Sequence, residues 1–421
     1  MSAGLRRAVS SLAVPNYRRY FAGQVVSISG NWMQMVAEMW LILKLTNSGV
    51  SVGLTAGLQF VPILLLGAWG GLIADRFPKR RILMITQPLM AVPALTLWLL
   101  TAAGTVAPWM VFALVLVRGT VNAFDNPARQ SFVIELVGPE RVVNAVSLNS
   151  VIVQSARIIG PAAAGAVIAL AGVGPCFALN ALSFIAMFVA LRGMDPRALR
   201  AAPPAQRAER ELRAALRYVG GAPALWIPLG MMVLVGTLSF NFQVIMPLLA
   251  SQTWHGTAST YALLTASMAV GSVIGALAAG ARGRVSAGIL VAAATAFGVV
   301  ELLAAAAPSL PLQVLALIPL GAVSVTFSAG VNSTMQLAVA PAMRGRVMAL
   351  YSVVFLGSTP FGAPLVGWLA QVAGPRAGMA LGGTAALAAA ALAAIAYTRT
   401  RQQAFAARPR FAILRAWSPW A

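Results

Sequence analysis

The sequence has few charged residues and very few acids. Only 9% of its 421 residues are charged, with 9 Asp or Glu against 30 Lys or Arg. Soluble domains carry about a quarter of their residues as charges, so an ordinary soluble protein is excluded. The chain is 59% hydrophobic and its mean hydropathy is +0.83. These values predict an integral membrane protein with many spans.

Cysteine and histidine are nearly absent. The single cysteine, Cys176, excludes an intrachain disulfide, and the single histidine, His255, leaves no His/Cys cluster for a metal. The sequence also has no Gly-Lys-Ser/Thr loop that could hold a nucleotide phosphate. We therefore expect no metal, no cofactor and no enzymatic activity.

The net charge of +21 could indicate nucleic-acid binding, but the basic residues are spread over many short segments. They precede the first apolar run, recur in every second loop and continue in the central linker and the tail. The other side receives only Lys44 and Arg376. This asymmetry predicts a bacterial inner-membrane protein with both termini in the cytoplasm and no nucleic-acid partner.

The apolar runs predict an all-α fold of twelve transmembrane helices in two six-helix bundles. The spans are expected near residues 20–45, 50–74, 82–103, 108–128, 145–170, 174–192, 224–249, 260–281, 286–306, 311–334, 347–370 and 377–397. The corresponding domains are a first bundle (1–192), a cytoplasmic linker with an amphipathic helix (193–222), a second bundle (223–398) and a basic cytoplasmic tail (399–421).

A weak internal repeat supports the two bundles. Asn126 and Gln130 at the end of span 4 recur as Asn332 and Gln336 at the end of span 10, both at an offset of 206 residues. A Gly/Pro cluster follows each pair in the next span. The repeat is therefore parallel, as in transporters built from two related halves.

The turn between spans 2 and 3 carries a dense group of charges. It reads Gly70-Gly71-Leu72-Ile73-Ala74-Asp75-Arg76-Phe77-Pro78-Lys79-Arg80-Arg81. We expect the glycines to let two helices approach closely, Asp75 to accept from the N–H groups of a neighbouring helix end, and the basic residues to stay in cytoplasmic water. This string resembles the signature loop of the major facilitator superfamily of secondary transporters, which usually has Gly in place of Pro78.

Further segments resemble one branch of that superfamily, which contains the enterobactin exporter and the macrolide and drug efflux proteins. They are Asn126–Gln130, Asn144–Ser150, Ala156–Pro161, Gln336, Pro341 and Arg344–Met348. The resemblance implies a two-bundle carrier that exports a small molecule by alternating access, and it does not name the cargo.

Span 1 has a stripe of polar residues at spacings of 3, 4, 3 and 4, namely Gln24, Ser27, Asn31, Gln34 and Glu38. This spacing places all five on one helix face. Two interpretations remain open. The stripe lines a translocation path in which Glu38 titrates, or it forms a hydrogen-bonded helix interface with Glu38 in water near the outer surface.

Span 4 repeats the pattern with Arg118, Asn122, Asp125 and Arg129. Asp125 and Arg129 are expected to form a local i, i+4 ion pair, while the resemblance implies that Arg118 takes part in proton coupling. Span 5 places its polar residues on one face and ends at Gly160-Pro161, where a bend or close packing is expected. Its polar face comprises Ser147, Ser150, Gln154 and Arg157.

The charged residues suggest a coupling scheme. We expect Arg118 and Arg157 near the midplane opposite Glu38, so that a proton and an anionic cargo compete for the arginines. The second half is nearly uncharged. Asn241 is expected to reach the cavity, and Glu301 to lie at the outer membrane interface.

We therefore predict proton-coupled efflux of a small amphipathic or anionic molecule, of siderophore or drug type, by a monomer in a lipid bilayer. The predicted proton-coupling and cavity residues are Glu38, Arg118, Arg157, Asn31, Gln34, Asn122, Gln154 and Asn241. The predicted conformational switch comprises Gly71, Asp75, Arg76, Arg80, Arg81, Asp125, Arg129, Gly160 and Pro161. The alternatives are a carrier of the same fold with another cargo or direction, such as lysophospholipid flipping or nutrient uptake, and a sensor or scaffold that transports nothing.

Overall fold

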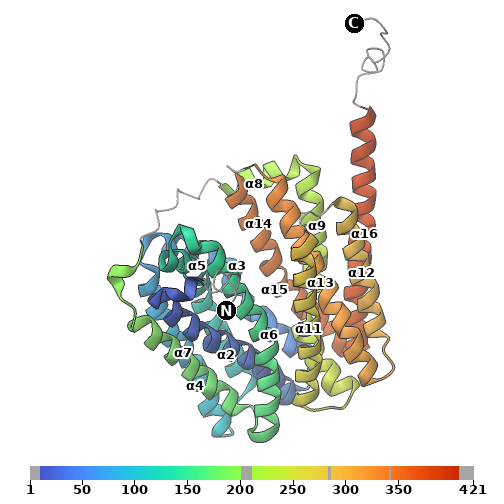
Figure 1. The fold of residues 1–421 in the computed structure, drawn as a ribbon. Coiled ribbons are helices and arrows are strands. Elements are labelled where there is room, and N and C mark those ends of the chain that lie inside the picture. Colours follow the sequence, from blue (N-terminus) through green and yellow to red (C-terminus); the bar gives the residue numbers. More distant parts are fainter. Residues whose placement is uncertain (1–9, 201–210, 283–285, 341–342, 407–421) are drawn as a thin grey trace, which may run out of the picture.

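The computed structural model describes residues 10–200, 211–282, 286–340 and 343–406, and all regular structure in these ranges is helical (Figure 1). Ten helical segments are long and apolar enough to cross a membrane. Eight are single helices: α3 (Gly49–Arg76), α4 (Lys79–Ala102), α6 (Val142–Ala171), α7 (Gly174–Arg192), α11 (Ala258–Arg282), α12 (Ala287–Ala305), α13 (Leu310–Ala338) and α16 (Pro375–Ala406). Their bounds lie within about four residues of the predicted spans, except that α16 continues past residue 397 to Ala406, into the segment predicted as the tail.

Two of the ten segments are interrupted helices. One consists of α9 (Pro223–Leu238), α10 (Phe242–Leu248) and the π-helical turn η4 (Leu249–Thr253). The other consists of α14 (Arg344–Gly357) and α15 (Thr359–Ala373). We predicted one continuous span in each place, because an apolar run has the same composition whether or not its helix is broken.

Two further long helices, α2 (Pro15–Thr46) and α5 (Pro108–Val137), carry more charge than the ten. Both exceed the roughly 20 residues that a span needs. Their charged residues Glu38, Arg118 and Asp125 are buried by protein. The charges in the middle of these helices are therefore held inside the molecule, while Arg18, Arg19 and Lys44 near the ends of α2 are exposed.

Proline and glycine mark the helix ends. Pro15, Pro108 and Pro223 are first residues of α2, α5 and α9, where the missing N–H is not needed and the fixed φ suits the helix. Gly138 and Gly172 follow α5 and α6 with φ of 72° and 81°. Glycine reaches these positive φ values without a steric penalty, so both helices end there.

The helices pack as two groups, called here the first half (α2–α7) and the second half (α9–α16) (Figure 1). Within the first half α3 packs on α5 and α4 on α7, and within the second half α11 packs on α13 and α12 on α16. The turn face is the end of the molecule that holds the α3–α4 turn at Phe77–Pro78. The opposite face holds Asn47–Ser48 and Gly374.

The halves meet through small residues near the opposite face. Gly49, Gly53 and Gly57 of α3 lie one turn apart and face α15, and a methyl group on Gly53 would overlap the carbonyl of Ala363. Ser48 reinforces this contact, since its Oγ donates to Gln371 Oε1 over 2.7 Å. Close backbone approach at small residues is the usual way in which helices associate in membranes.

The linker contains η3 (Pro196–Ala198) and α8 (Glu211–Gly220). Ala215 and Val219 of α8 are buried, whereas Leu216 is exposed. The helix packs against α9 and α14, close to the end of the molecule where Arg344 begins α14 (Figure 1). Residues 201–210 of the linker and 407–421 of the predicted tail lie outside the described residues, as do Arg6 and Arg7.

Candidate functional site

The first half contains a cavity of about 580 Å³ between α2, α3, α4, α5 and α6. Its wall changes from buried to exposed toward the turn face, since Arg118 is 7% exposed while Gln130 and Val146 are exposed. The cavity therefore opens at the turn face. Its polar wall residues are Gln24, Asn31, Gln59, Arg118, Asn122, Asp125, Asn126, Arg129, Gln130 and Asn149.

The deep wall of the cavity carries a buried ion pair. Arg118 donates through one terminal N–H to Glu38 Oε2 over 2.6 Å, and Glu38 is fully buried behind it. Gln34 Nε2 donates to Glu38 Oε1 over 2.7 Å, and Asn180 of α7 donates to Gln34 Oε1. The Nε of Arg118 is buried without a partner.

Both interpretations of the span 1 stripe are partly right. Gln24 and Asn31 line the cavity, whereas Gln34 lies in the interface with α7. The expectation that Glu38 lies in water near the outer surface is wrong, because α5 and α7 cover this side of α2 and Arg118 neutralises the charge.

Arg157 does not face Glu38, which corrects the predicted arrangement of the two arginines. Its guanidinium lies over the ring of Trp32, 5.2 Å from the ring centroid, and it makes no ion pair within the described residues. Trp32 itself lines the cavity. Arg157 is therefore a cation held by an aromatic face next to the cavity, without an acid to neutralise it.

Of the asparagine and glutamine residues predicted for the site, some line the cavity and others lie between packed helices. Asn31 and Asn122 line the cavity, and neither makes a side-chain hydrogen bond within the described ranges. Gln154 is partly buried and lies outside the cavity wall. Asn241, predicted for a cavity between the halves, does not line this one; it is buried in the second half, where its Nδ2 donates to the carbonyl of Thr237.

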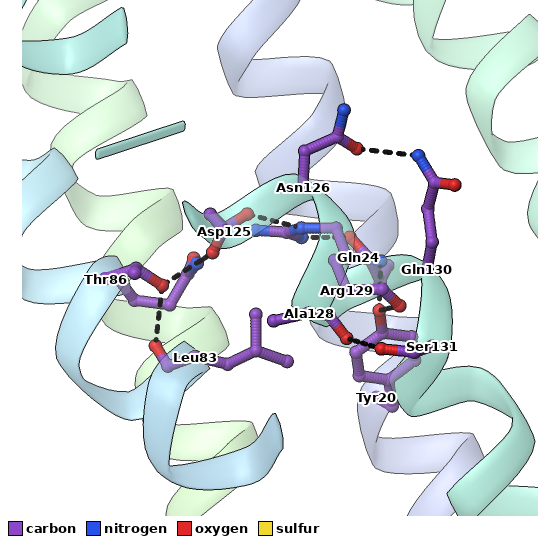
Figure 2. A network of polar contacts seen from close by, with 11 residues as sticks. Tyr20, Gln24, Leu83, Thr86, Asp125, Asn126, Ala128, Arg129, Gln130 and Ser131 are labelled. Atoms are coloured by element: carbon purple, nitrogen blue, oxygen red, sulfur yellow. Dashed lines mark hydrogen bonds and ion pairs between the residues drawn. The ribbon is translucent and has the colours of Figure 1, made fainter. Parts of the chain in front are cut away.

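Nearer the turn face, a second buried network joins α2, α4 and α5 (Figure 2). The predicted pair is confirmed, with Arg129 Nε 2.8 Å from Asp125 Oδ2. Thr86 and Gln87 both donate to Asp125 Oδ1, over 2.6 and 2.7 Å. Arg129 also donates to Gln24 Oε1. Asp125 and Arg129 thus hold three helices together at the wall of the cavity.

The two glycines at the start of the charged turn differ, since no atom of a neighbouring helix lies within 4 Å of where a side chain on Gly71 would begin. The preceding Gly70 makes the expected close approach, against the backbone of Ala123 in α5. At Gly160 the expected close packing is present: a methyl group there would meet Trp32 and the backbone of Ser29. Helix α6 continues through Pro161.

The charged turn is only partly engaged. Arg80 donates to the carbonyls of Leu191 and Arg192, at the end of α7. Asp75, Arg76 and Arg81 are exposed, and Asp75 accepts no hydrogen bond within the described residues. The expected contact of Asp75 with a helix end is therefore absent in this conformation, because the two halves meet near the opposite face and not here.

Glu301 lies four residues before the end of α12, near the opposite face as expected, but it is not exposed there. It is 2% exposed, because α13, α16 and the end of α9 cover this part of α12. The second half therefore holds a buried acid outside the cavity just described.

A sequence profile of the transmembrane secretion effector family matches residues 7–413. The chain belongs to this family of major facilitator transporters. The transporter is 26% identical over 385 residues to the enterobactin exporter EntS of Citrobacter koseri, and the match covers 88% of each chain. It is also 26% identical over 265 residues to the staphyloferrin A transporter of Staphylococcus aureus. This match covers 61% of the chain and 65% of that relative, which is just under two thirds of the relative's length.

Solved structures share the fold. A bacterial homologue of the lysosomal transporter Spinster, inward-facing and occupied, superposes with a TM-score of 0.71 at 16% identity, covering 91% of this chain and 97% of that one. An inward-facing bacterial homologue of ferroportin gives a TM-score of 0.68 at 16% identity, covering 91% and 98%. At such identities the likeness shows the fold alone, and it confirms the all-helical major facilitator class.

The sequence did not indicate several residues that build the site of this transporter. Asn180 completes the chain behind Glu38, and Tyr20, Thr86 and Gln87 complete the network around Asp125. Thr86, Gln87 and Asn180 do not belong to a long polar stripe, which was the signal that identified spans 1 and 4. Tyr20 lies four residues before Gln24, so it extends the span 1 stripe by one turn and could have been identified from that spacing.

Proposed function

We propose that this transporter exports a small anionic or amphipathic molecule of siderophore type from the cytoplasm, in exchange for protons. The Arg118–Glu38 pair on the cavity wall is the observation that carries the proposal. A buried ion pair with a matched hydrogen-bond network is the kind of group whose partner can be exchanged for a proton or for a charged cargo. The named relatives, which handle enterobactin and staphyloferrin A, support the cargo class.

The architecture in this proposal is twelve spans, formed by the ten segments together with α2 and α5, in two six-helix bundles. The turn face is the cytoplasmic side, because Lys and Arg concentrate in the segments there. The cavity then opens to the cytoplasm while the glycine contacts of α3 and α15 close the other side. We assign this conformation to cargo loading in an alternating-access cycle of a monomer.

Cargo binding uses the cavity groups that have no partner. Asn31 and Asn122 offer amide donors and acceptors, and Arg157 on Trp32 offers a positive charge. Aromatic and apolar wall residues such as Phe60 and Met90 can cover the less polar parts of the cargo. An anion that reaches Arg118 competes with Glu38 for the same guanidinium.

Exchange requires that Glu38 carries its proton only on the return step. We propose that cargo loads from the cytoplasm while Glu38 is ionised, and that Glu38 takes up a proton on the outer side as cargo leaves. After the return to the cytoplasmic side, Glu38 releases this proton and the Arg118–Glu38 ion pair forms again, so that one proton enters as one cargo molecule leaves. The switch residues Asp75, Arg76 and Arg81, exposed here, are proposed to bind across the halves when the cytoplasmic side closes.

The test is retention of cargo by cells with and without the gene. Enterobactin, staphyloferrin A, a macrolide, a lysophospholipid and a labelled nutrient are measured inside and outside the cells, with and without a protonophore. We expect export of one siderophore class, lost in the presence of protonophore and in Glu38→Gln. Accumulation of lipid or nutrient would favour another cargo of the same fold, and no movement of any compound would favour a sensor or scaffold.

A further inference from the structure

The strongest unassigned feature of the molecule is Glu301. It is the only acid after residue 211 of the sequence, and it lies in α12, outside the cavity of the first half. Its side chain is almost fully buried, with 2% of the residue exposed. Its Oε2 is buried and has no hydrogen-bond partner in the part of the chain that the structure describes.

The carboxyl lies against bare backbone. A methyl group on Gly382 of α16 would overlap the carboxyl oxygen Oε1 of Glu301 and come within 3.0 Å of the Cα of Ser239. Gly382 therefore makes room for the acid. Ser239 stands at the end of α9, and its Oγ donates to the carbonyl of Gly382 over 2.6 Å.

The same place is where the helix of α9 is interrupted. Residues Ser239–Asn241 separate α9 from α10. The Ser239 N–H still donates to the carbonyl of Val235 in the regular helical way, but the Phe240 N–H donates to that same carbonyl and the Asn241 N–H donates to the carbonyl of Ser239, so the helical hydrogen-bond pattern ends here. Asn241 uses its Nδ2 to bind the carbonyl of Thr237, but its Oδ1 is buried without a donor. Among the described residues, Asn241 Oδ1 and Glu301 Oε2 are therefore two buried acceptors that receive no hydrogen bond.

Within the described residues, no ion pair balances the acid. The helices that pack on α12 are α13 and α16, and Ser239 of α9 touches the Gly382 that covers the carboxyl. Helices α9, α10 and α13 contain no charged residue. In α16 the cation closest in sequence to Gly382 is Arg376. Its guanidinium donates to the carbonyl of Ala307 over 2.7 Å and lies over the ring of Trp254. Arg399 and Arg401 lie at the far end of that helix.

We propose that Glu301 is a proton-binding site of the second half, occupied in this conformation, released to the cytoplasm when the Ser239–Asn241 break rearranges, and filled again from the outer side. A carboxylate without a counter-ion or donor is strongly disfavoured in an apolar interior, whereas a proton makes the group neutral and gives it a donor. A break in a spanning helix is the natural element to move, because its backbone groups can exchange partners. The inference does not depend on the cargo or on the role of Glu38.

The direct test is the protonation state of Glu301 in the purified full-length protein. The infrared difference spectrum between wild type and Glu301→Gln should show the carbonyl band of a protonated carboxylic acid at neutral pH. The dicyclohexylcarbodiimide reagent, which attacks protonated buried carboxyls, should modify Glu301 and leave the ion-paired Glu38 unmodified. A spectrum that contains only carboxylate bands for this residue overturns the proposal.

Sodium is the rival occupant, since a small cation could also balance the acid. Adding Na⁺ at fixed pH should leave both the infrared band and the modification by carbodiimide unchanged. If Na⁺ protects Glu301 and removes the acid band, the site binds sodium and the proton assignment is wrong.

The functional test uses reconstituted vesicles and Glu301→Gln, which keeps the size of the side chain and is permanently neutral. We expect cargo exchange without a gradient to continue, and the number of protons moved per cargo to fall by one. The thermal midpoint should stay close to that of wild type. A clear rise in the midpoint, or an unchanged proton count, contradicts a site that is protonated here and released during the cycle.

Discussion

The two halves of the transporter treat buried charge in opposite ways. In the first half Glu38, Arg118, Asp125 and Arg129 form two buried pairs, each embedded in further hydrogen bonds. The second half holds a single acid, Glu301, which is buried and makes no ion pair within the part of the chain that the structure describes. A charged group in an ion pair can exchange its partner for another charged group, whereas an acid without a counter-ion can only gain or lose a proton. The two halves, for which the sequence predicts a common repeat, therefore differ in their chemistry.

The largest effect is expected from breaking the pair that defines the first half. Arg118→Ala leaves Glu38 buried without a counter-ion, and we expect the free energy of unfolding to fall by about 3 to 5 kcal/mol. The double variant Glu38→Gln with Arg118→Met removes both charges and should recover most of the stability but no proton-driven export. Thermal unfolding in detergent, combined with export assays, checks both results. If Arg118→Ala and the double variant had the same free energy of unfolding, the prediction that Arg118 compensates the buried charge of Glu38 would be wrong.

The next largest effect is expected at the contact between the halves, called here the seam, where α3 packs on α15. Gly53→Val places a branched side chain on the backbone of Ala363, so the contact of α3 with α15 has to open. We expect export to fall more than about tenfold, since each 1.4 kcal/mol of bias between conformations is a factor of ten. Accessibility of introduced cysteines at the opposite face measures the opening.

A matched control for that prediction is Gly71→Val. Nothing lies near a side chain at this position in the present conformation. We expect the seam to stay closed in this variant, so that cysteines at the opposite face remain protected. Protection lost equally in both variants would show that the effect is not specific to the seam.

A smaller effect is expected at the free cation of the first half. Trp32→Leu removes the ring beneath Arg157, and a cation–π contact of this kind is worth about 0.5 to 2 kcal/mol. We expect the affinity for an anionic cargo to fall by a factor of roughly 2 to 30, with Trp32→Phe in between. Binding is measured with the purified protein, and a neutral cargo analogue should show no change.

The smallest effect on stability is expected at Asp75. Because its side chain is exposed and unpaired here, Asp75→Asn should change the free energy of unfolding by less than about 0.5 kcal/mol. Turnover should nevertheless slow, because the proposed role of Asp75 belongs to the closed cytoplasmic side. Thermal unfolding and export rates, measured on the same preparation, separate the two. A large loss of stability would show that Asp75 already has a structural role in this conformation.

Much of the fold could be predicted from the sequence because membrane insertion constrains it locally. A span needs about 20 apolar residues whatever it packs against, so the helix bounds agree with the hydropathy pattern. The i, i+4 spacing of Asp125 and Arg129 likewise made their pair predictable. The helix break at Ser239–Asn241 was not predictable in this way, because it depends on packing against Gly382.

The sequence by itself determined that the chain is a many-span helical membrane protein, and its periodicity showed which faces of spans 1 and 4 are polar. Only the tertiary structure decided which polar groups meet. Arg118 reaches Glu38 across 80 residues of chain, while Arg157 turns to Trp32 and Glu301 is covered by α16. The physical reason is that helical periodicity acts within one element, whereas partners of a buried charge are chosen by the packing of several.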